Sequence, residues 1–432
     1  MASSSTSDTA HGAASTIGAN ERRFGLFDHA ALWFSLGVGL LVMQVGASLM
    51  PGLSARDALI AIVAGSLLGA GLLAWVAAIG ARHGLSSSAL IGAALGRVFG
   101  ALPVGLNVLQ LFGWTAFELV VMRDGSTALL HRFGLQAAWA APVVTLLWGA
   151  LLIALAAGSM VGLVRRFVSR FGLPLVVLSL AWMSWQFTER LVAQGFAAWW
   201  SRPGSGGMTA LQALDLVIAM PVSWLPLVAD YARYGRSPRS TLSGTWLGYT
   251  VANLWCYALG VVVVATASAD ADLMATLLLA QGGLVALGII LIDEVDNAYG
   301  DVHSGAVSTH FLSRARWSIR RIGMVLALLA TGAALVLPMN SLEPFLLLLS
   351  SVFVPLFGVV ISQLAFTDLP APRAVRLGPA LLWIAGIVCF QLGSVYWPEW
   401  GSALPSLALT LVGGALLRLL PQRRHPGPVG AG

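Results

Sequence analysis

The stretch "SLGVGLLVMQVGASLMPG", residues 35–52, decides the fold together with its counterpart "AMPVSWLPLVADY", residues 219–231. Both interrupt an apolar run, the first with glycines and the second with Pro221 and Pro226. A proline inside a helix removes a backbone donor and clashes with the carbonyl one turn back. In a membrane, non-helical backbone persists only where protein covers it or where it lines a polar cavity. One such kink is typical of ordinary helix packing, but a pair in corresponding positions indicates a transporter binding site.

The composition around these two stretches is that of a membrane protein. Of the 432 residues, 58% are hydrophobic and 10% are charged, whereas a soluble domain carries about 25% charged residues. Apolar runs recur from Ala31 to Leu420, and each is long enough to cross a hydrocarbon core about 30 Å thick. The sequence therefore predicts an all-α polytopic membrane protein.

The apolar runs predict twelve transmembrane helices, at residues 28–51, 57–80, 102–123, 138–158, 173–194, 209–231, 242–266, 282–300, 322–338, 344–366, 377–395 and 402–420. The segment 86–100 between the second and third spans is too short to cross and is expected to lie at the membrane interface. Lysine is absent, so the positive-inside rule rests on arginine alone. If both termini are cytoplasmic, only five of the 24 basic residues face the other side: Arg56, Arg123, Arg132, Arg190 and Arg202. We expect a multi-pass protein of the plasma membrane, here a bacterial inner membrane.

The two interrupted spans also predict an internal repeat. They are the first and the sixth, and because five is odd, a second five-helix unit starts from the opposite face of the membrane. This predicts two inverted repeats, at 27–200 and 205–367, with the binding site between them and two peripheral helices at 375–420. The polar ends, 1–26 and 421–432, are expected to be disordered cytoplasmic tails.

Span three carries a polar stripe. In "GLNVLQLFGWTAFELVVM", residues 105–122, Asn107, Gln110, Trp114 and Glu118 fall on one helical face. A carboxylate at mid-membrane costs at least ~2.5–3 kcal/mol, so Glu118 should face a cavity or a partner. Stacking on Trp114 and hydrogen bonding to Glu118 would suit a planar heterocycle. The alternative is a structural pairing of Glu118 with a polar residue of another helix.

Span eight carries an acidic stretch, "LIDEVDNAYGDVHSG", at residues 291–305. Helical spacing puts Asp293, Asp296, Asn297 and Asp301 on one face and Glu294 elsewhere. Carboxylates this close cannot all be ionised at low dielectric, so some must be protonated or bound to a cation. This is the chemistry of a coupling ion, either H⁺ or Na⁺. The alternative is that the helix ends early and that the residues after Gly300 form a solvated loop.

Other classes of function find little support in the sequence. It contains no Cys/His metal spacing, Walker loop, dinucleotide fingerprint or nucleophile elbow. We expect a small heterocyclic substrate and the lipid bilayer as partners, with no nucleic acid and no obligate protein partner. We also expect no catalytic residue and no cofactor beyond the coupling ion. The runner-up from another class is a membrane-embedded metal-dependent enzyme built on the acidic stretch, which would need a second acidic or histidine motif.

Four segments resemble the nucleobase:cation symporter-1 family. "LNVLQLFGWTAFELV" (106–120) and "MPVSWLPLVADYARYGR" (220–236) are similar to its third and sixth spans, and "WFSLGVGLLVMQVGASLMPG" (33–52) and "DVHSGAVS" (301–308) extend the likeness over the ten-helix core. The nearest branch is that of hydroxymethylpyrimidine and thiamine precursors. The resemblance implies a LeuT-like fold of five plus five helices and cation-coupled uptake of a pyrimidine-like base. Purine, allantoin or hydantoin transport is the alternative within the family.

The resemblance also implies roles for the substrate site. Trp114 matches the stacking tryptophan of span three, and Glu118 matches the amide or acidic position one turn further on. Asp301 falls where relatives contact the substrate through Asn or Asp, and Gln44 is expected near the ligand. Gln110 and Pro221 are further candidates for substrate contact. The stacking tryptophan of span six in hydantoin-type relatives falls near Pro221 here, which leaves the second aromatic wall open.

The cation site follows from the same comparison. Span one would contribute backbone carbonyls near Val42. The span-eight hydroxyls that bind sodium in similar sodium-coupled members fall at Val295 and Asp296 here. Asp296, with Asp293 beside it, is therefore the expected position of the coupling cation.

Overall fold

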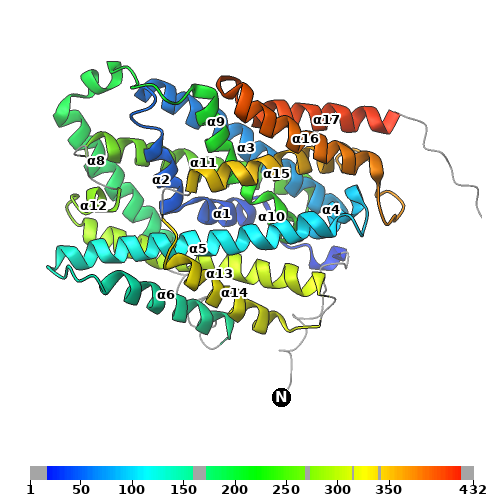
Figure 1. Cartoon of the computed structure of the whole chain (residues 1–432), viewed down its shortest axis with the longest axis horizontal. Helices are drawn as coiled ribbons and strands as arrows, with labels where there is room; N and C mark the ends of the chain where they lie inside the picture. The colour runs from blue at the N-terminus through cyan, green and yellow to red at the C-terminus, as the bar shows by residue number, and fades with distance from the viewer. Residues whose placement is uncertain (1–16, 159–171, 268–272, 314–315, 339–341, 420–432) are drawn as a thin grey trace, which may run out of the picture.

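A computed structural model describes residues 17–158, 172–267, 273–313, 316–338 and 342–419 of the chain (Figure 1). Within these ranges the regular structure is helical, and the only β-type pairing is an isolated bridge between Phe24 and Gly235. The first half contains η1 (Ala19–Glu21), α1 (Leu26–Gly37), α2 (Leu40–Ser48), α3 (Ala55–His83), α4 (Ser87–Leu95), α5 (Ala101–Arg132), α6 (Ala140–Ala156) and α8 (Leu173–Ser201). The second half contains α9 (Ala210–Ser223), α10 (Leu225–Ala232), α11 (Pro238–Ala265), α12 (Leu273–Leu277), α13 (Gly283–Leu312), α14 (Ile319–Ala334), α15 (Leu342–Leu364), α16 (Leu377–Tyr396), η4 (Pro398–Trp400) and α17 (Ala403–Leu419).

These helices make the chain a multi-pass membrane protein. Among the described residues, five helices are long and apolar enough to span a bilayer, and seven spans result if each bent pair counts as one. Two shorter helices, α6 and α17, are also apolar. At 30 residues α13 has the length, but the acids of the stretch 291–305 interrupt its apolar character. Every predicted span coincides with a helix or a bent pair, while the number twelve stays a prediction.

Both predicted interruptions are present. The axis bends by 60° between α1 and α2 and by 40° between α9 and α10. At the first break Val38 and Gly39 adopt extended backbone conformations, so the chain leaves one helix and enters the next. At the second break Pro226 lies in the first turn of α10, where the missing N–H costs no helical hydrogen bond. Glycine and proline therefore set the two breaks locally, as the sequence predicts.

The broken first span packs along α11. Small residues recur every fourth position on this helix, at Gly244, Gly248, Ala252, Cys256 and Gly260, and such stripes let helix backbones approach closely in membranes. A Cβ atom on Gly248 would overlap the carbonyl oxygen of Ala30 in α1. One on Gly260 would overlap that of Met43 in α2. The stripe thus fixes α1 and α2 against the same neighbour on either side of the break.

The folded part begins before α1. The N–H of Ile17 donates to the carbonyl of Gly84 at 3.0 Å, and the Arg22 guanidinium donates to the carbonyl of Ala81 at 2.9 Å. Phe24 pairs with the turn that joins α10 to α11. The predicted disordered tail 1–26 is therefore too long, since residues 17–26 are folded, while residues 1–16 and the tail 421–432 lie outside the described residues.

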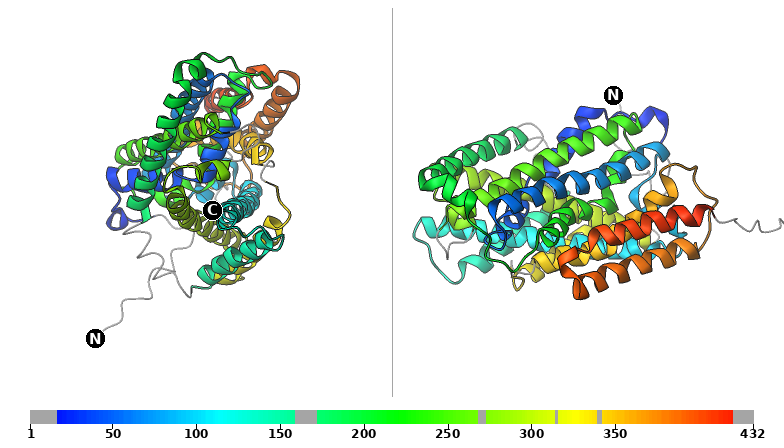
Figure 2. Two further views of the ribbon diagram at one scale, coloured as in Figure 1. Left: turned by 90° about the vertical axis from the view of Figure 1, so that its left-hand side faces the viewer. Right: turned by 90° about the horizontal axis from the view of Figure 1, so that it is seen from above.

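The segment expected at the interface forms the nine-residue helix α4, which is too short to cross. Its start is tied to α10 by two hydrogen bonds. The Ser87 N–H donates to Asp230 at 3.2 Å, and the Ala229 N–H donates to the Ser87 hydroxyl at 2.9 Å. At the other edge of the fold, α16 and α17 lie together on one side of the bundle (Figure 2).

Candidate functional site

The two breaks meet at a cavity of about 30 Å³, enough for one or two water molecules. Three further helices, α5, α11 and α13, complete its wall. The lining residues are Leu36, Val38, Gly39, Leu41, Val42, Leu111, Trp114, Glu118, Met220, Ser223, Trp224, Leu227, Tyr249, Glu294, Asn297 and Asp301. The cavity combines an aromatic and aliphatic wall with three acids, an amide and the hydroxyl-bearing residues Ser223 and Tyr249.

Glu294 joins α13 to the broken first span. Its Oε1 accepts a hydrogen bond of 2.5 Å from the backbone N–H of Leu40, the first residue of α2, and its Oε2 lies 3.5 Å from the Nδ2 of Asn297. The first N–H groups of a helix have no partner within it, and a carboxylate there is also favoured by the helix dipole. Glu294 is 1% exposed, so this contact is shielded from solvent.

Glu118 approaches the same carboxylate from α5. Its side chain is buried and faces that of Glu294. An ionised carboxylate can only accept hydrogen bonds, so two carboxyl groups can form a hydrogen bond with each other only when one of them is protonated. Among the described residues Glu118 Oε2 has no hydrogen-bond partner. The two carboxyl groups therefore lie together beside the cavity, where a proton could bridge them.

Two tryptophans line the cavity, one on α5 and one at the break between α9 and α10. Trp114 of α5 is held edge-on by Phe345, with ring centroids 5.3 Å apart, and its buried Nε1 has no partner among the described residues. Trp224 is the residue between α9 and α10, and Trp33 of α1 holds it edge-on at 6.0 Å. Trp224 thus lines the cavity at the second break, where the sequence comparison left the second aromatic wall open.

Gln110 lies behind the second break. Its amide nitrogen donates to the carbonyl of Ser223 and to Asn107 Oδ1, both at 2.8 Å. Ser223 is the last residue of α9, so its carbonyl is one of the acceptors that a helix end leaves unpaired. Gln110 is buried and does not line the cavity. It braces α5 against the break, while its predicted substrate contact stays untested.

The other predicted residues separate into two groups. Val42, Trp114, Glu118 and Asp301 come together around the cavity. Gln44 instead lines a different cavity of about 430 Å³, with Asp124, His131 and Arg132 among its neighbours. Pro221 packs against Gly69 of α3, whose added Cβ would overlap the proline ring. Neither Gln44 nor Pro221 lines the cavity between the breaks.

The face of α13 that lines the cavity differs from the predicted face, because Glu294 takes the place of Asp293 and Asp296. The sequence puts Asp293, Asp296, Asn297 and Asp301 toward the first span and Glu294 elsewhere, whereas the cavity is lined by Glu294, Asn297 and Asp301. Asp293 is buried outside the cavity, and Asp296 is partly exposed. Spacings of three and four residues place the observed set on one face equally well. The alternative of an early end is wrong, because α13 continues to Leu312.

Comparisons with known proteins agree with this architecture. A family model described as permease for cytosine/purines, uracil, thiamine and allantoin matches residues 16–368. The cytosine permease of Escherichia coli O157:H7 is 27% identical over 341 residues, which cover 74% of this chain and 73% of that protein.

Among solved structures, the inward-facing conformation of Mhp1 has a TM-score of 0.78 at 15% identity and covers 96% of this chain and 94% of its own. Mhp1 in a closed conformation with bromovinylhydantoin bound has a TM-score of 0.72 at 16% identity, covering 94% and 93%. At such identities the likeness is one of fold, and it confirms the predicted LeuT-like arrangement. The family match covers most of the chain, which therefore belongs to the permeases for cytosine/purines, uracil, thiamine and allantoin, the nucleobase:cation symporter-1 family, and is a transporter rather than an enzyme.

Proposed function

We propose that this symporter imports an aminopyrimidine, of the kind represented by hydroxymethylpyrimidine or cytosine, together with a proton held by Glu118 and Glu294. The observation that carries the proposal is that these two buried carboxyl groups face each other beside a cavity lined by Trp114 and Trp224. The cytosine permease among the similar proteins supports the same substrate class.

Recognition of the amino group follows from the donors and acceptors around the cavity. Glu118, Glu294 and Asp301 supply acceptor oxygens, and a carboxylate that is ionised can accept hydrogen bonds but not donate them. An aminopyrimidine offers an exocyclic NH₂ group to such acceptors, whereas a carbonyl at the same position would oppose oxygen to oxygen. Stacking on Trp114 contributes affinity for any planar ring, whichever substituents the ring carries. The site is therefore expected to prefer 4-aminopyrimidines over uracil.

Coupling to a proton follows from the position of Glu294. Its ionised form attracts the N-terminus of α2 through charge and a hydrogen bond, and its neutral form holds that helix less strongly. Protonation of the pair would therefore bias the angle between the two halves of the first span. Since α2 lines the cavity through Leu41 and Val42, proton binding and substrate binding would act on the same moving element.

Sodium is the competing coupling ion. We favour the proton because the face of α13 that lines the cavity presents the carboxyl groups of Glu294 and Asp301 beside Asn297. Carboxyl groups that carry protons are neutral and need no metal ion to balance their charge. Within the family, a purine, allantoin or hydantoin substrate is the alternative to a pyrimidine. The same uptake experiment separates these possibilities.

The test uses the full-length protein in sealed proteoliposomes with protein-free vesicles as the control. Uptake of labelled hydroxymethylpyrimidine, cytosine, uracil and allantoin is measured with Na⁺ replaced by choline, and again with a protonophore. We expect the two aminopyrimidines to accumulate under an inward proton gradient, without Na⁺, and to lose accumulation when the protonophore is added. Uptake that needs Na⁺ and survives the protonophore would contradict proton coupling. Preference for uracil or allantoin would contradict the substrate class.

We further propose that both termini lie in the cytoplasm of a bacterial inner membrane. The support is the distribution of arginine, because hydrogen bonds bring the segments that carry Arg82, Arg97, Arg236, Arg373 and Arg376 together at one end of the helices. Reporter fusions at the C-terminus test this orientation. An active periplasmic alkaline phosphatase fusion would contradict it, and a fluorescent cytoplasmic fusion is expected.

A further inference from the structure

A second cavity lies at the arginine-rich end of the bundle, away from the site between the two breaks. It measures about 550 Å³ and is enclosed by α4, the start of α5 and the segment 365–376 that joins α15 to α16. Most of its lining is apolar or small: Leu85, Ser88, Ala89, Gly92, Ala93, Gly100, Ala101, Val104, Leu369, Pro370, Ala371 and Pro372. The two remaining lining residues are Arg97 and Arg373.

The walls of this cavity are held by backbone hydrogen bonds. The N–H of Arg97 donates to the carbonyl of Arg373, and the N–H of Arg376 donates to that of Leu95, both at 2.9 Å. Gly96 has φ = 97°, and a Cβ there would approach the carbonyl oxygen of Ala374 to 2.6 Å. The joining segment is thus fixed against the end of α4, and a side chain at position 96 would push it away.

The arginines give the mouth of the cavity a positive charge. Arg97 and Arg373 are exposed, and within the described ranges neither guanidinium has an acidic partner. Burial and the positive charge of Arg373 lower the pKa of the neighbouring Arg376. The single acid of the joining segment, Asp368, interacts with His83 instead. Within the described ranges no acid of the chain balances the positive charge at the mouth, which leaves it available to an anion from outside the chain.

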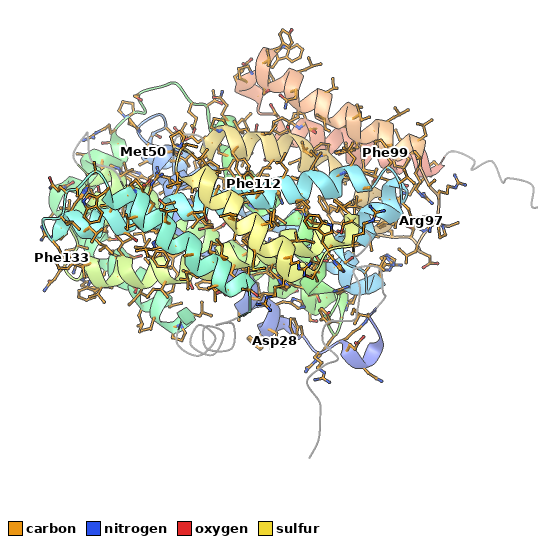
Figure 3. The ribbon with its side chains drawn as sticks, turned by 60° about the horizontal axis from the view of Figure 1, so that its bottom comes forward. Asp28, Met50, Arg97, Phe99, Phe112 and Phe133 are labelled. Carbon is orange, nitrogen blue, oxygen red and sulfur yellow. The ribbon has the colours of Figure 1, made fainter. Side chains whose placement is uncertain are left out.

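The surroundings of the arginines are apolar. Val98 is 67% exposed, Leu102 55% and Leu377 67%, which suits side chains that face lipid. Phe99 anchors the turn by packing edge-on against Trp383 of α16, with ring centroids 5.9 Å apart. Figure 3 shows Arg97 and Phe99 at this end of the molecule, far from Phe133 at the opposite end. An anion bound here would sit at the boundary between lipid and water.

We propose that this cavity binds one anionic phospholipid, with the phosphate held by Arg97 and Arg373 and an acyl chain in the apolar space beneath them. Basic pockets between transmembrane helices on the cytoplasmic side are sites for such headgroups. A free phosphate would use the arginines but leave the apolar space unfilled. The chain's own C-terminal tail is a poor occupant because its Arg423 and Arg424 carry the same charge as the site.

The test is native mass spectrometry of the full-length protein in detergent. It is incubated in turn with phosphatidylglycerol, with phosphatidylcholine of identical chains, and with glycerophosphoglycerol, which is the headgroup without chains. Three variants are compared with the unmodified protein. Arg97→Gln/Arg373→Gln removes the charge, Gly92→Leu fills the cavity from a position where an added Cβ meets nothing within 4 Å, and Arg56→Gln/Arg202→Gln removes two exposed arginines at the opposite end.

We expect one tightly retained phosphatidylglycerol per chain. The Arg97→Gln/Arg373→Gln variant should lower its retention by roughly tenfold to thirtyfold, because each basic contact contributes to binding an anionic lipid. Gly92→Leu should lower it with both arginines intact, and Arg56→Gln/Arg202→Gln should leave it unchanged. Size-exclusion elution and substrate binding establish that each variant is folded.

Four results would overturn the proposal. Equal retention of phosphatidylcholine would show that charge is irrelevant, and equal binding of glycerophosphoglycerol would show a free-anion site. Unchanged phosphatidylglycerol in Gly92→Leu would remove the acyl chain from the cavity. A dimer that dissociates in Arg97→Gln/Arg373→Gln would identify the occupant as a second copy. If the double arginine variant fails to fold, Gly92→Leu alone decides the outcome.

Discussion

The backbone N–H of Leu40 donates a 2.5 Å hydrogen bond to the carboxylate of Glu294, which lies 254 residues further along the chain. This contact links the second half of the broken first span to α13 inside a buried site. A helix N-terminus without a side-chain partner there would leave its N–H groups unsatisfied. The contact is also the point at which a change of charge on Glu294 acts directly on the position of a helix.

The first prediction concerns the proton. Glu294→Gln keeps an oxygen that can accept from Leu40 but cannot gain or lose a proton at pH 5–8. Uptake driven by an inward proton gradient should fall to the level reached without a gradient, while exchange of labelled for unlabelled substrate stays within about twofold. Both are measured in the same proteoliposomes. Acidifying the outside should raise uptake by the unmodified protein and leave Glu294→Gln unaffected.

The matched control for the proton is Asp296→Asn. Asp296 lies half a turn away on α13, is partly exposed and does not line the cavity, so its variant should still accumulate substrate under the gradient. The opposite pattern, with Asp296→Asn uncoupled and Glu294→Gln fully coupled, would return the cation site to the position that the sequence predicts.

The second prediction concerns the aromatic walls. Trp114→Ala should raise the Kd for hydroxymethylpyrimidine by roughly fivefold to 150-fold, because stacking of a base on an aromatic side chain contributes ~1–3 kcal/mol. Trp224→Ala should have an effect of similar size if the second tryptophan closes on the ring. Equilibrium binding to the purified protein measures both. Trp200→Ala, at an exposed position on α8, is the control and should bind as the unmodified protein does.

The third prediction concerns the brace behind the second break. Gln110→Leu removes the donor to Ser223 and leaves a buried carbonyl unpaired, which costs ~1–3 kcal/mol of stability. Thermal unfolding in detergent should show a lower midpoint for this variant. Gln391→Leu, on the exposed side of α16, changes the same residue type outside any such contact and should shift stability by less than ~0.5 kcal/mol. Equal midpoints for the two would remove the structural role of Gln110.

The fourth prediction concerns the small-residue stripe of α11. Gly260→Ala forces a methyl group onto the carbonyl of Met43 and should cost at least ~1–3 kcal/mol, as overpacking does. Gly105→Ala and Gly288→Ala are matched controls, since a Cβ at either position meets nothing within 4 Å. These two should be neutral or stabilising by up to ~1 kcal/mol, because alanine is the better helix former. The ranking of thermal midpoints checks the prediction, and a stable Gly260→Ala would contradict the packing of α2 on α11.

Much of the fold is predictable because its causes are local in sequence. Apolar runs of membrane length give the helices, and Pro226 and the glycines around Val38 give the breaks through backbone chemistry that needs no tertiary contact. The offset of five spans from the first break to the second, an odd number, then predicts the inverted repeat. The Trp114 and Glu118 stripe is predictable for the same reason, because residues four apart on one helix share a face in any environment.

The tertiary structure alone decided which acids of α13 meet the broken span. With 3.6 residues per turn, a helix that carries acids at 293, 294, 296 and 301 offers two adjacent faces of nearly equal polarity, and spacing cannot choose between them. Packing against α2 and α5 made the choice, because the unpaired N–H of Leu40 and the carboxyl of Glu118 both meet Glu294. Packing also placed Gln44 in another cavity and Pro221 against Gly69, so neither lines the cavity between the breaks. The sequence by itself determined where the chain bends, and long-range contacts determined which side chains those bends bring together.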